Sequence, residues 1–316
     1  MGRYIIRRIV VAMPSLAIVT VLIAGLLRLQ PGDVVMARLS ESGYLTQEDV
    51  DEMRAELGLD KSFPEQYVDW VTGVFQGDLG VSLWTGRDVL ETLATRSRVS
   101  IQLAIMSMVV AICTAIPLGI VSAVKQDSWM DYVARLFSIT GLSVPDFFLA
   151  TMLLYVLSVW VGWLPDFGYT PPWEDPWANM QAFVFPALIV GYRLSAITAR
   201  MTRSAMLEVL RQDYVRTARA KGLVERIVIF KHALRNALIP VITIIGSQLT
   251  FLLGGLVIIE VVFSLPGVGT LGFEAIQVRD YPVVQGVVFF TAILFITSNL
   301  LVDLSYAIID PRIRYS

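Results

Sequence analysis

The sequence is poor in the residues that most catalytic and metal sites need. Its 316 residues include one cysteine, Cys113, and one histidine, His232. A single cysteine excludes a disulfide framework and a cysteine-rich metal site within the chain, and a single histidine excludes a site built from several imidazoles. Charged residues make up only 16% of the chain and hydrophobic residues 55%, which is too apolar for an ordinary soluble domain. The composition therefore indicates a polytopic membrane protein.

The chain also lacks the motifs of a nucleotide-hydrolysing or proteolytic enzyme. No Gly-Lys dipeptide occurs, so there is no Walker phosphate loop, and the glycine-rich segment 264–272 contains no lysine. The segment 141–143, Gly-Leu-Ser, would suit an intramembrane serine protease only with a base beside the serine. His232 is expected in a cytoplasmic loop instead. We therefore expect no catalytic site and no ATP hydrolysis in this chain.

Long, almost uncharged runs recur along the sequence and determine its fold class. Each is long enough to cross the ~30 Å hydrocarbon core of a bilayer as a helix. The six expected spans are residues 9–27, 99–124, about 132–161, about 183–201, about 237–259 and 281–302. Pro145 is expected to kink or break the third span, while Asp146 and Arg193 inside spans need a partner or water, or must snorkel. The sequence thus predicts an all-α membrane protein with six transmembrane helices.

The distribution of lysine and arginine orients these spans. Basic residues cluster before the first span, between the second and third, in a long loop at about 203–236, and at the C-terminus. With six spans, all these segments fall on one side, which the positive-inside rule assigns to the cytoplasm together with both termini. Arg3, Arg7 and Arg8 precede an uncharged run of spanning length, so we interpret the start as a retained helix rather than a cleaved signal peptide.

The link between the first two spans is then extracytoplasmic and long enough for a small helical layer. Thr46 and Gly58 are expected to cap one helix, and Ser62 and Gly77 a second. Such a layer would either cover helix ends or form a platform for an external protein, and the sequence leaves both open. The predicted organisation is 1–30 for the first segment and span, 31–98 for the insertion, and 99–316 for the transmembrane core with its cytoplasmic loop.

Within the basic loop, residues 213–222 have the pattern of a short capped helix. Asp213 is expected as the N-cap, Lys221 lies where a cation suits the negative helix end, and Gly222 suits the left-handed position after the helix. Two helical turns are too short to be stable alone in water. The stretch is therefore either a solvated connector or a docking helix for a cytosolic partner.

The same loop carries a resemblance to a known family. The run DYVRTARAKGL at 213–223, followed by HALRNALIP at 232–240, resembles the dipeptide and oligopeptide permeases of binding-protein-dependent ABC importers. The family loop is usually written Glu-Ala-Ala, three residues, Gly; here Arg216 replaces its acidic residue and Arg235 stands where a proline is expected. Further matching segments are 77–82, 167–169, 175–177, 262–267 and 303–312. The resemblance covers essentially the whole chain.

The resemblance implies a type I ABC importer permease fold in a prokaryotic cytoplasmic (inner) membrane, with a small helical extracytoplasmic insertion. It implies a second homologous permease subunit, two cytosolic ATPase subunits that bind ATP and magnesium, and an extracytoplasmic substrate-binding protein. No cofactor in this chain and no nucleic acid are expected. Peptides are the implied cargo; glutathione, nickel complexes, opines or oligosaccharides are alternatives within the same class. A channel or ion-coupled carrier is the remaining class, and the sequence shows none of the inverted repeats that would favour it.

The resemblance makes the 213–222 helix a coupling helix seated in a groove of one ATPase. Tyr214, Val215 and Ala218 would then make apolar contacts, and the cations would meet acidic groups. The residues expected in this coupling site are Asp213, Tyr214, Val215, Arg216, Ala218, Arg219, Lys221 and Gly222. The fifth span is the most polar and glycine-interrupted, although packing alone explains its glycines equally well. The residues expected to line the translocation path are Gln248, Gly254, Gly255 and Glu260.

Overall fold

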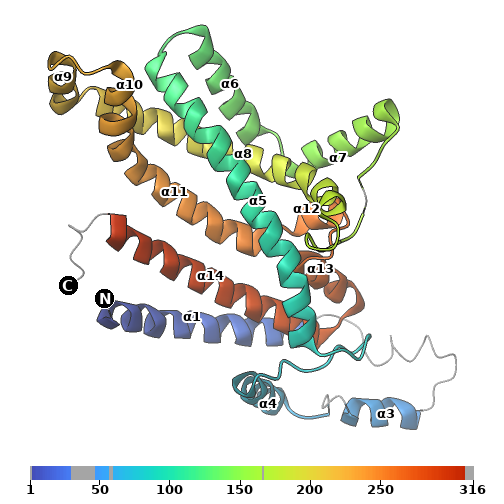
Figure 1. Ribbon diagram of the computed structural model, residues 1–316. Coiled ribbons are helices and arrows are strands. Elements are labelled where there is room, and N and C mark those ends of the chain that lie inside the picture. The colour runs from blue at the N-terminus through green and yellow to red at the C-terminus, as the bar shows by residue number, and fades with distance from the viewer. Residues whose placement is uncertain (1, 30–46, 57–59, 166, 310–316) are drawn as a thin grey trace. The chain divides into compact units, whose positions relative to one another are not determined.

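The computed structural model describes residues 2–29, 47–56, 60–165 and 167–309 (Figure 1). Over these ranges the regular elements are helices, joined by one isolated antiparallel bridge between Val81 and Asp88. The predicted all-α class is confirmed. The chain divides into two compact units, one formed by residues 1–99 with 266–296 and the other by 100–265 with 297–316.

The first unit combines N-terminal helices with a helical hairpin from the end of the chain. Its helices are α1 (Gly2–Leu29), α3 (Gln47–Glu56), α4 (Phe63–Gln76), the start of α5 (Val89–Val124), α13 (Val268–Val278) and the start of α14 (Tyr281–Ile309). Val89 and Leu93 of α5 are fully buried against Val283 and Val284 of α14. Because α5 begins at Val89, the helix that contains the second predicted span starts ten residues before residue 99, inside the predicted insertion.

Local capping signals in this unit form as the sequence predicts. The carboxylate of Glu65 accepts hydrogen bonds from the backbone N–H of Ser62 (2.9 Å) and from its hydroxyl (2.7 Å), at the start of α4. These bonds hold the pKa of Glu65 below its usual range. Gly77 ends α4 at φ 84°, the left-handed region. The predicted caps of α3, Thr46 and Gly58, lie outside the described residues.

The segment after α4 is fastened to the connection between α13 and α14. Buried Asp280 accepts a hydrogen bond from the hydroxyl of Ser82 (2.5 Å) and another from the N–H of Leu83 (3.1 Å). The indole N–H of Trp84 donates to the carbonyl of Val278 (2.6 Å). These hydrogen bonds offset part of the cost of burying the carboxylate. The 77–82 motif thus has a structural role within the first unit.

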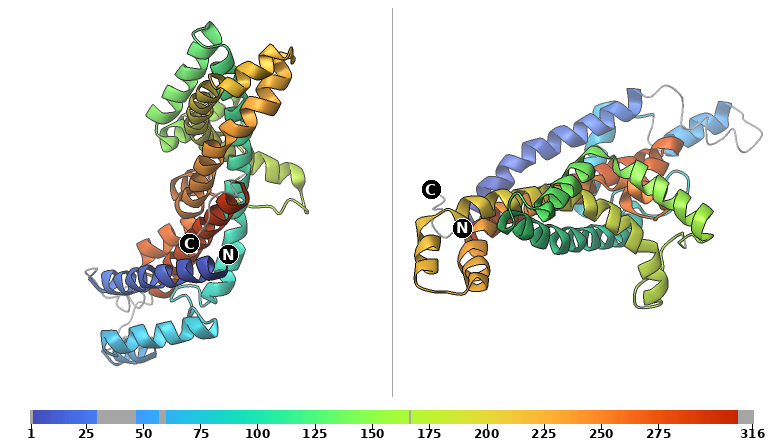
Figure 2. Two further views of the ribbon diagram at one scale, coloured as in Figure 1. Left: turned by 90° about the vertical axis from the view of Figure 1, so that its left-hand side faces the viewer. Right: turned by 90° about the horizontal axis from the view of Figure 1, so that it is seen from above.

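The second unit is built around one long, largely buried helix. It contains the rest of α5, α6 (Trp129–Ser143), α7 (Asp146–Val156), η1 (Leu157–Val161), α8 (Pro176–Leu210), α9 (Asp213–Ala220), α10 (Glu225–Ile227), η2 (Val228–Ala233), α11 (Leu234–Gly255), α12 (Val257–Val262) and the end of α14. About two thirds (67%) of the most apolar stretch of α8 is buried. The helices α6 and α11 pack along α8, as the views in Figures 1 and 2 agree.

Of the six predicted spans, four are single helices long and apolar enough to cross a membrane within the described residues, a fifth is a bent helix pair, and the first is a shorter apolar helix. Helices long and apolar enough to cross a membrane are Val89–Val124, Pro176–Leu210, Glu225–Leu252 and Tyr281–Val302. The third span is a pair of helices, α6 followed by α7 and η1, with a bend of 101° between the two. The break includes Pro145, so the predicted break is confirmed. The fifth span does not run to residue 259: α11 ends at Gly255, and α12 starts afresh at Val257. The first span lies within α1, whose shorter apolar part is Met13–Gly25.

The two charges predicted inside spans are partners of one another. A guanidinium nitrogen of Arg193 on α8 lies 2.9 Å from a carboxylate oxygen of Asp146, the first residue of α7. The same guanidinium lies over the ring of Phe251, 5.6 Å from its centroid. Asp146 also sits at a helix N-terminus, where negative charge is favoured. The pairing confirms that neither charge is left facing lipid alone.

Candidate functional site

The loop helix α9 is held by its own chain. Val215 is fully buried and Ala218 is buried, and both pack against Val228 of η2. The partly buried Val209 and Leu210, at the end of α8, complete this small core. In Figure 1, α9 lies beside α10 at one end of the second unit. The packing that two isolated turns cannot supply is therefore intramolecular, and the contact of Val215 and Ala218 with a partner was wrongly predicted.

The two ends of α9 differ in how well the sequence predicts them. Asp213 is the first helical residue and not the N-cap, which is Gln212 in an extended conformation (φ −70°, ψ 148°). At the other end, Gly222 adopts φ +77°, as predicted. Its N–H donates to the carbonyl of Arg219 (2.9 Å), and that of Leu223 to the carbonyl of Ala218 (3.4 Å). These two bonds form a Schellman motif, which requires the left-handed residue.

The polar residues of α9 are only partly free to meet a partner. Arg219 forms a two-pronged contact with Glu225 of α10, at 2.7 and 3.2 Å, so the acidic group that it meets here belongs to its own chain and not to a partner. The hydroxyl of Tyr214 accepts a hydrogen bond from the side chain of Asn236 (2.7 Å). The other exposed cations here are Arg216, which pairs loosely with Asp213 (3.6 Å), and Lys221.

An exposed apolar row beside α9 was missed by the sequence reasoning. Val224, Ile227 and Phe230 are 67%, 43% and 54% exposed. Ile227 and Phe230 line a cavity of about 400 Å³ together with Arg226 and Lys231. The signal was present in the sequence as apolar residues three positions apart, the spacing of one helix face. This row offers the apolar contact surface that the prediction assigned to Val215 and Ala218.

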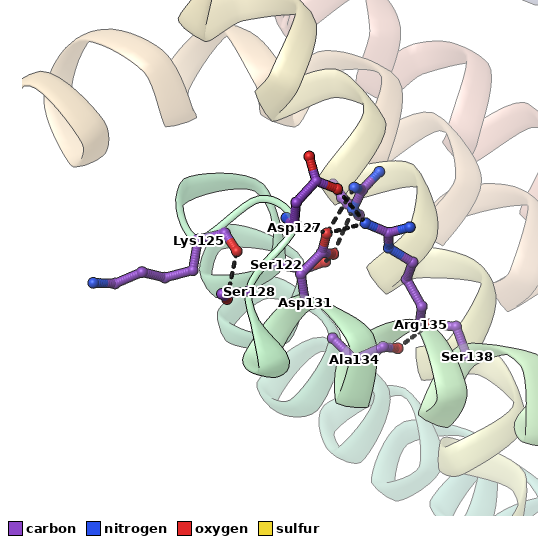
Figure 3. A network of polar contacts seen from close by, with 9 residues as sticks. Ser122, Lys125, Asp127, Ser128, Asp131, Ala134, Arg135 and Ser138 are labelled. Atoms are coloured by element: carbon purple, nitrogen blue, oxygen red, sulfur yellow. Dashed lines mark hydrogen bonds and ion pairs between the residues drawn. The ribbon is translucent and has the colours of Figure 1, made fainter.

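A second cluster lies where α5, α6 and α8 meet (Figure 3). The carboxylate of Asp131 on α6 is fully buried and accepts two hydrogen bonds from Arg203 of α8, at 2.8 and 3.0 Å. It also accepts from Arg135, from the hydroxyl of Ser122 on α5 (2.5 Å), and from the N–H of Asp127 (3.0 Å). Five donors thus converge on one carboxylate, four from three helices and one from the turn between α5 and α6, and they compensate for its burial. The four-residue spacing of Asp131 and Arg135 was the only signal in the sequence.

The residues predicted for the translocation path are used to tie helices together. Gln248 on α11 is buried; its amide oxygen accepts from Thr198 of α8 (3.1 Å), and its nitrogen donates to the carbonyl of Leu194 (3.2 Å). Glu260 on α12 is buried and accepts from Ser100 of α5 (2.6 Å). Gly254 and Gly255 form the end of α11, directly before the break at Leu256. Their surroundings lie outside the described side chains.

A polytopic helical chain with a small amphipathic helix fastened at one end of its bundle has the organisation of a transport permease. Comparison with known proteins agrees. Residues 115–315 match the family described as binding-protein-dependent transport system inner membrane component, and residues 1–104 match the N-terminal region of the same membrane components. The chain belongs to this family. It is a permease subunit of an ABC transport system, and a protein of the membrane.

Relatives match this chain from end to end. It is 42% identical over 315 residues to a glutathione transport system permease protein, GsiC, of Pectobacterium atrosepticum, with both chains fully covered. It is 41% identical over 315 residues to a putative peptide transport system permease protein of Brucella abortus, again with full coverage of both. It is 39% identical over 333 residues to a dipeptide transport system permease protein, DppB, of Alkalihalophilus pseudofirmus, with 99% of each chain covered.

A solved structure shares the fold. The crystal structure of an amino acid ABC transporter with histidines matches 68% of this chain and 93% of its own, with a TM-score of 0.52 and 13% identity. At that identity the likeness bears on the fold alone. Together with the family match, it identifies the fold as that of the type I importer permeases.

Proposed function

We propose that this chain forms half of the translocation path of an ATP-driven importer of peptides, and that α9 couples it to a cytosolic ATPase. The observation that carries the proposal is the anchoring of α9 by Val215 and Ala218, which fixes a short helix rigidly to α8 and η2. A rigid helix passes on a displacement, whereas a solvated connector absorbs it. A docking helix is therefore favoured over a connector.

The cargo is argued from the relatives. Those named above carry peptide, dipeptide and glutathione in their names, and all three are built from amino-acid residues joined by amide bonds. Peptides, including glutathione, are accordingly the proposed cargo. Nickel complexes and oligosaccharides receive no comparable support. A stand-alone channel or ion-coupled carrier is likewise not favoured by any feature of the described residues.

The proposed assembly assigns ATP hydrolysis and substrate binding to subunits other than this chain. This chain has no Walker motif, so ATP and magnesium would be bound by two ATPase subunits beneath the basic loop. A second homologous permease would complete the path, and a substrate-binding protein would dock on the extracytoplasmic side. The loop and both termini would be cytoplasmic, in agreement with the lysine and arginine distribution.

The surface offered to the ATPase combines the outer side of α9 with the row that follows it. Tyr214, Arg216 and Lys221 are exposed on or directly after α9. The exposed Val224 and Ile227 continue this surface. A mainly apolar contact with cations at its edge is typical of a specific protein interface. Each exposed ion pair would contribute under about 1 kcal/mol, so fit matters more than any one charge.

The proposal is tested by replacing Gly222 with valine and with asparagine. A Cβ at this position has open space, so any effect arises from the backbone conformation at φ +77° alone. Valine is strongly disfavoured there and costs about 1–2 kcal/mol, while asparagine tolerates the left-handed region. We expect Gly222→Val to lose most peptide uptake in proteoliposomes containing the ATPases and binding protein, and Gly222→Asn to retain most of it.

Two further readouts accompany uptake. Co-purification with the ATPases shows whether the variant still assembles, and stimulation of ATP hydrolysis by loaded binding protein reports coupling directly. The expected Gly222→Val result is retained assembly with lost stimulation. Normal stimulation and uptake in this variant would contradict the coupling role of α9, and absence of ATPases from the purified wild-type complex would contradict the importer.

A further inference from the structure

A cavity of about 330 Å³ opens between α5, α6 and α8, next to the Asp131 cluster. Its volume is at the lower end of the range for small-molecule sites. One part of its wall is polar and carries three arginines, Arg135, Arg200 and Arg203. Another part is apolar and includes Leu118, Ile139 and Leu142.

The polar wall of the cavity has more positive than negative charge, and it has hydrogen-bond donors without acceptors. Asp127 and Asp131 are the carboxylates paired with Arg135 and Arg203, so two negative charges face three guanidinium groups. Arg200 is exposed, and within the described residues it has neither an ion pair nor a hydrogen bond. The Nε of Arg135 is buried without a hydrogen-bond acceptor. A buried donor without an acceptor is costly, and an anion in the cavity would supply one.

The apolar wall continues onto an uncovered face of α6. Leu136 and Ile139 are each 61% exposed and Leu142 is 40% exposed. In a membrane chain, such a face is available to acyl chains. A ligand that occupies both walls at once must therefore be anionic at one end and hydrocarbon at the other.

The cavity lies near the same end of its helices as the basic loop. It is lined by α5 up to Ser122, close to the end of that helix at Val124, and by α8 up to Ser204, within two turns of its end at Leu210. The exposed Trp129 opens α6 at this level, and tryptophan is enriched at membrane–water interfaces. The polar wall is thus placed at headgroup depth, in the leaflet next to the positively charged loop.

We propose that this cavity binds the phosphate of an anionic phospholipid, with its acyl chains along Ile139 and Leu142. Arg200 and Arg135 donate to the phosphate oxygens, and Ser204 lies within the same wall. Arginine suits this contact because its planar guanidinium makes two-pronged hydrogen bonds to phosphate. Basic pockets between transmembrane helices are a known setting for such headgroups. The lipid would bridge α6 and α8 beside Asp131.

The test measures lipid binding to the full-length chain, purified in neutral detergent in the assembly in which it is expressed. The probes are phosphatidylglycerol, the zwitterionic lipid phosphatidylcholine, and the soluble headgroup glycerol phosphate. We expect retention of phosphatidylglycerol in native mass spectra and a rise in melting temperature with that lipid. Phosphatidylcholine should give a smaller rise, and glycerol phosphate should give little effect because it lacks the acyl chains.

Three variants separate this site from general attraction to basic surface. Arg200→Gln should weaken phosphatidylglycerol binding about tenfold, as expected for one charge-assisted contact. Ser204→Glu, at an exposed position that does not threaten folding, should weaken it at least as much by placing a carboxylate in the cavity. Lys125→Gln removes an exposed cation close to the end of α5 but outside the cavity, and should leave the affinity within about twofold.

Equal loss in Lys125→Gln and Arg200→Gln would overturn the proposal, because it would show attraction to surface charge alone. Equal effects of phosphatidylcholine and phosphatidylglycerol would overturn it by removing the role of the arginines. A full response to glycerol phosphate would show a site for soluble phosphate esters instead. A photo-crosslinking phosphatidylglycerol should label α6 or α8 peptides, and labelling confined to other helices would also contradict the assignment.

Discussion

The Asp131 cluster predicts a large loss of stability from one isosteric substitution. Asp131→Asn keeps the shape of the side chain but removes the charge that Arg203 and Arg135 share. Breaking a buried ion pair by removing one partner costs about 3–5 kcal/mol. The carboxylate is fully buried, but the side chains of Arg203 and Arg135 are 23% and 38% exposed, so part of the stranded charge can be solvated. We therefore expect a loss of about 3 kcal/mol.

The assay is reversible unfolding in mixed detergent micelles, followed by the fluorescence of the seven tryptophans. A double-mutant cycle isolates the interaction between Asp131 and Arg203. Arg203→Met alone leaves the Asp131 carboxylate without this partner, whereas the double variant removes both charges of the pair. The coupling energy between Asp131 and Arg203 should be at least about 1.5 kcal/mol, within the range for contacting residues in one network. A control is Asp69→Asn, which removes an ion pair to Lys61 at 2.6 Å between side chains that are about half exposed.

The control shows that burial, and not distance, determines the expected effect. The Lys61–Asp69 pair is as short as the contacts of Asp131, yet solvent screens it and its loss should not be measurable. An Asp131→Asn variant within about 0.5 kcal/mol of the wild type would refute the reasoning, because it would show that the cluster is not desolvated. A coupling energy near zero would refute it as well.

Two further predictions concern helix packing and the path. A Cβ added to Gly191 would lie 2.6 Å from Val110 Cγ1 and 2.9 Å from the carbonyl oxygen of Ser107, so Gly191→Val should separate α8 from α5 and lower the free energy of unfolding by about 2–3 kcal/mol. The control is Gly25→Val, which has open space around it and should be tolerated. Equal free energies of unfolding for the two variants would contradict the close approach of the helices. If the path runs along the exposed side of α11, cysteines that replace Thr243 and Ser247 in a Cys113→Ser background should react with a membrane-impermeant thiol reagent. A cysteine that replaces the buried Gln248 should not react. Faster labelling at position 248 than at position 247 would contradict this orientation.

Features set by neighbouring residues were predictable from the sequence. The caps at Ser62, Gly77 and Gly222 form because a side chain or a left-handed residue satisfies backbone groups one turn away. The break at Pro145 follows from the missing N–H and the ring of proline itself. These signals lie within a few residues, so the sequence contains the whole interaction.

Features that depend on residues far apart in the sequence could not be predicted. The sequence shows α9 as amphipathic but does not say what its apolar side meets; Val215 was assigned to a partner and packs instead on Val228. Gln248 and Glu260 were interpreted as path residues because polar groups in a span need a reason. The reason in the structure is hydrogen bonding to Thr198 and Ser100, which no local pattern reveals.

The Asp131 cluster and the α9 core lie on one continuous helix, and this bears on how a displacement would travel. Arg203 fastens α8 to α6, and Val209 and Leu210, about two turns further along α8, pack on α9. If α9 transmits a displacement as proposed, the ion pair between Arg203 and Asp131 would make α6 move together with α8. The bend at Pro145 follows α6, and the Asp146–Arg193 pair links the far side of that bend back to α8. If α9 has the proposed coupling role, Asp131→Asn should therefore reduce the stimulation of ATP hydrolysis by loaded binding protein, even though α9 and Gly222 are unchanged.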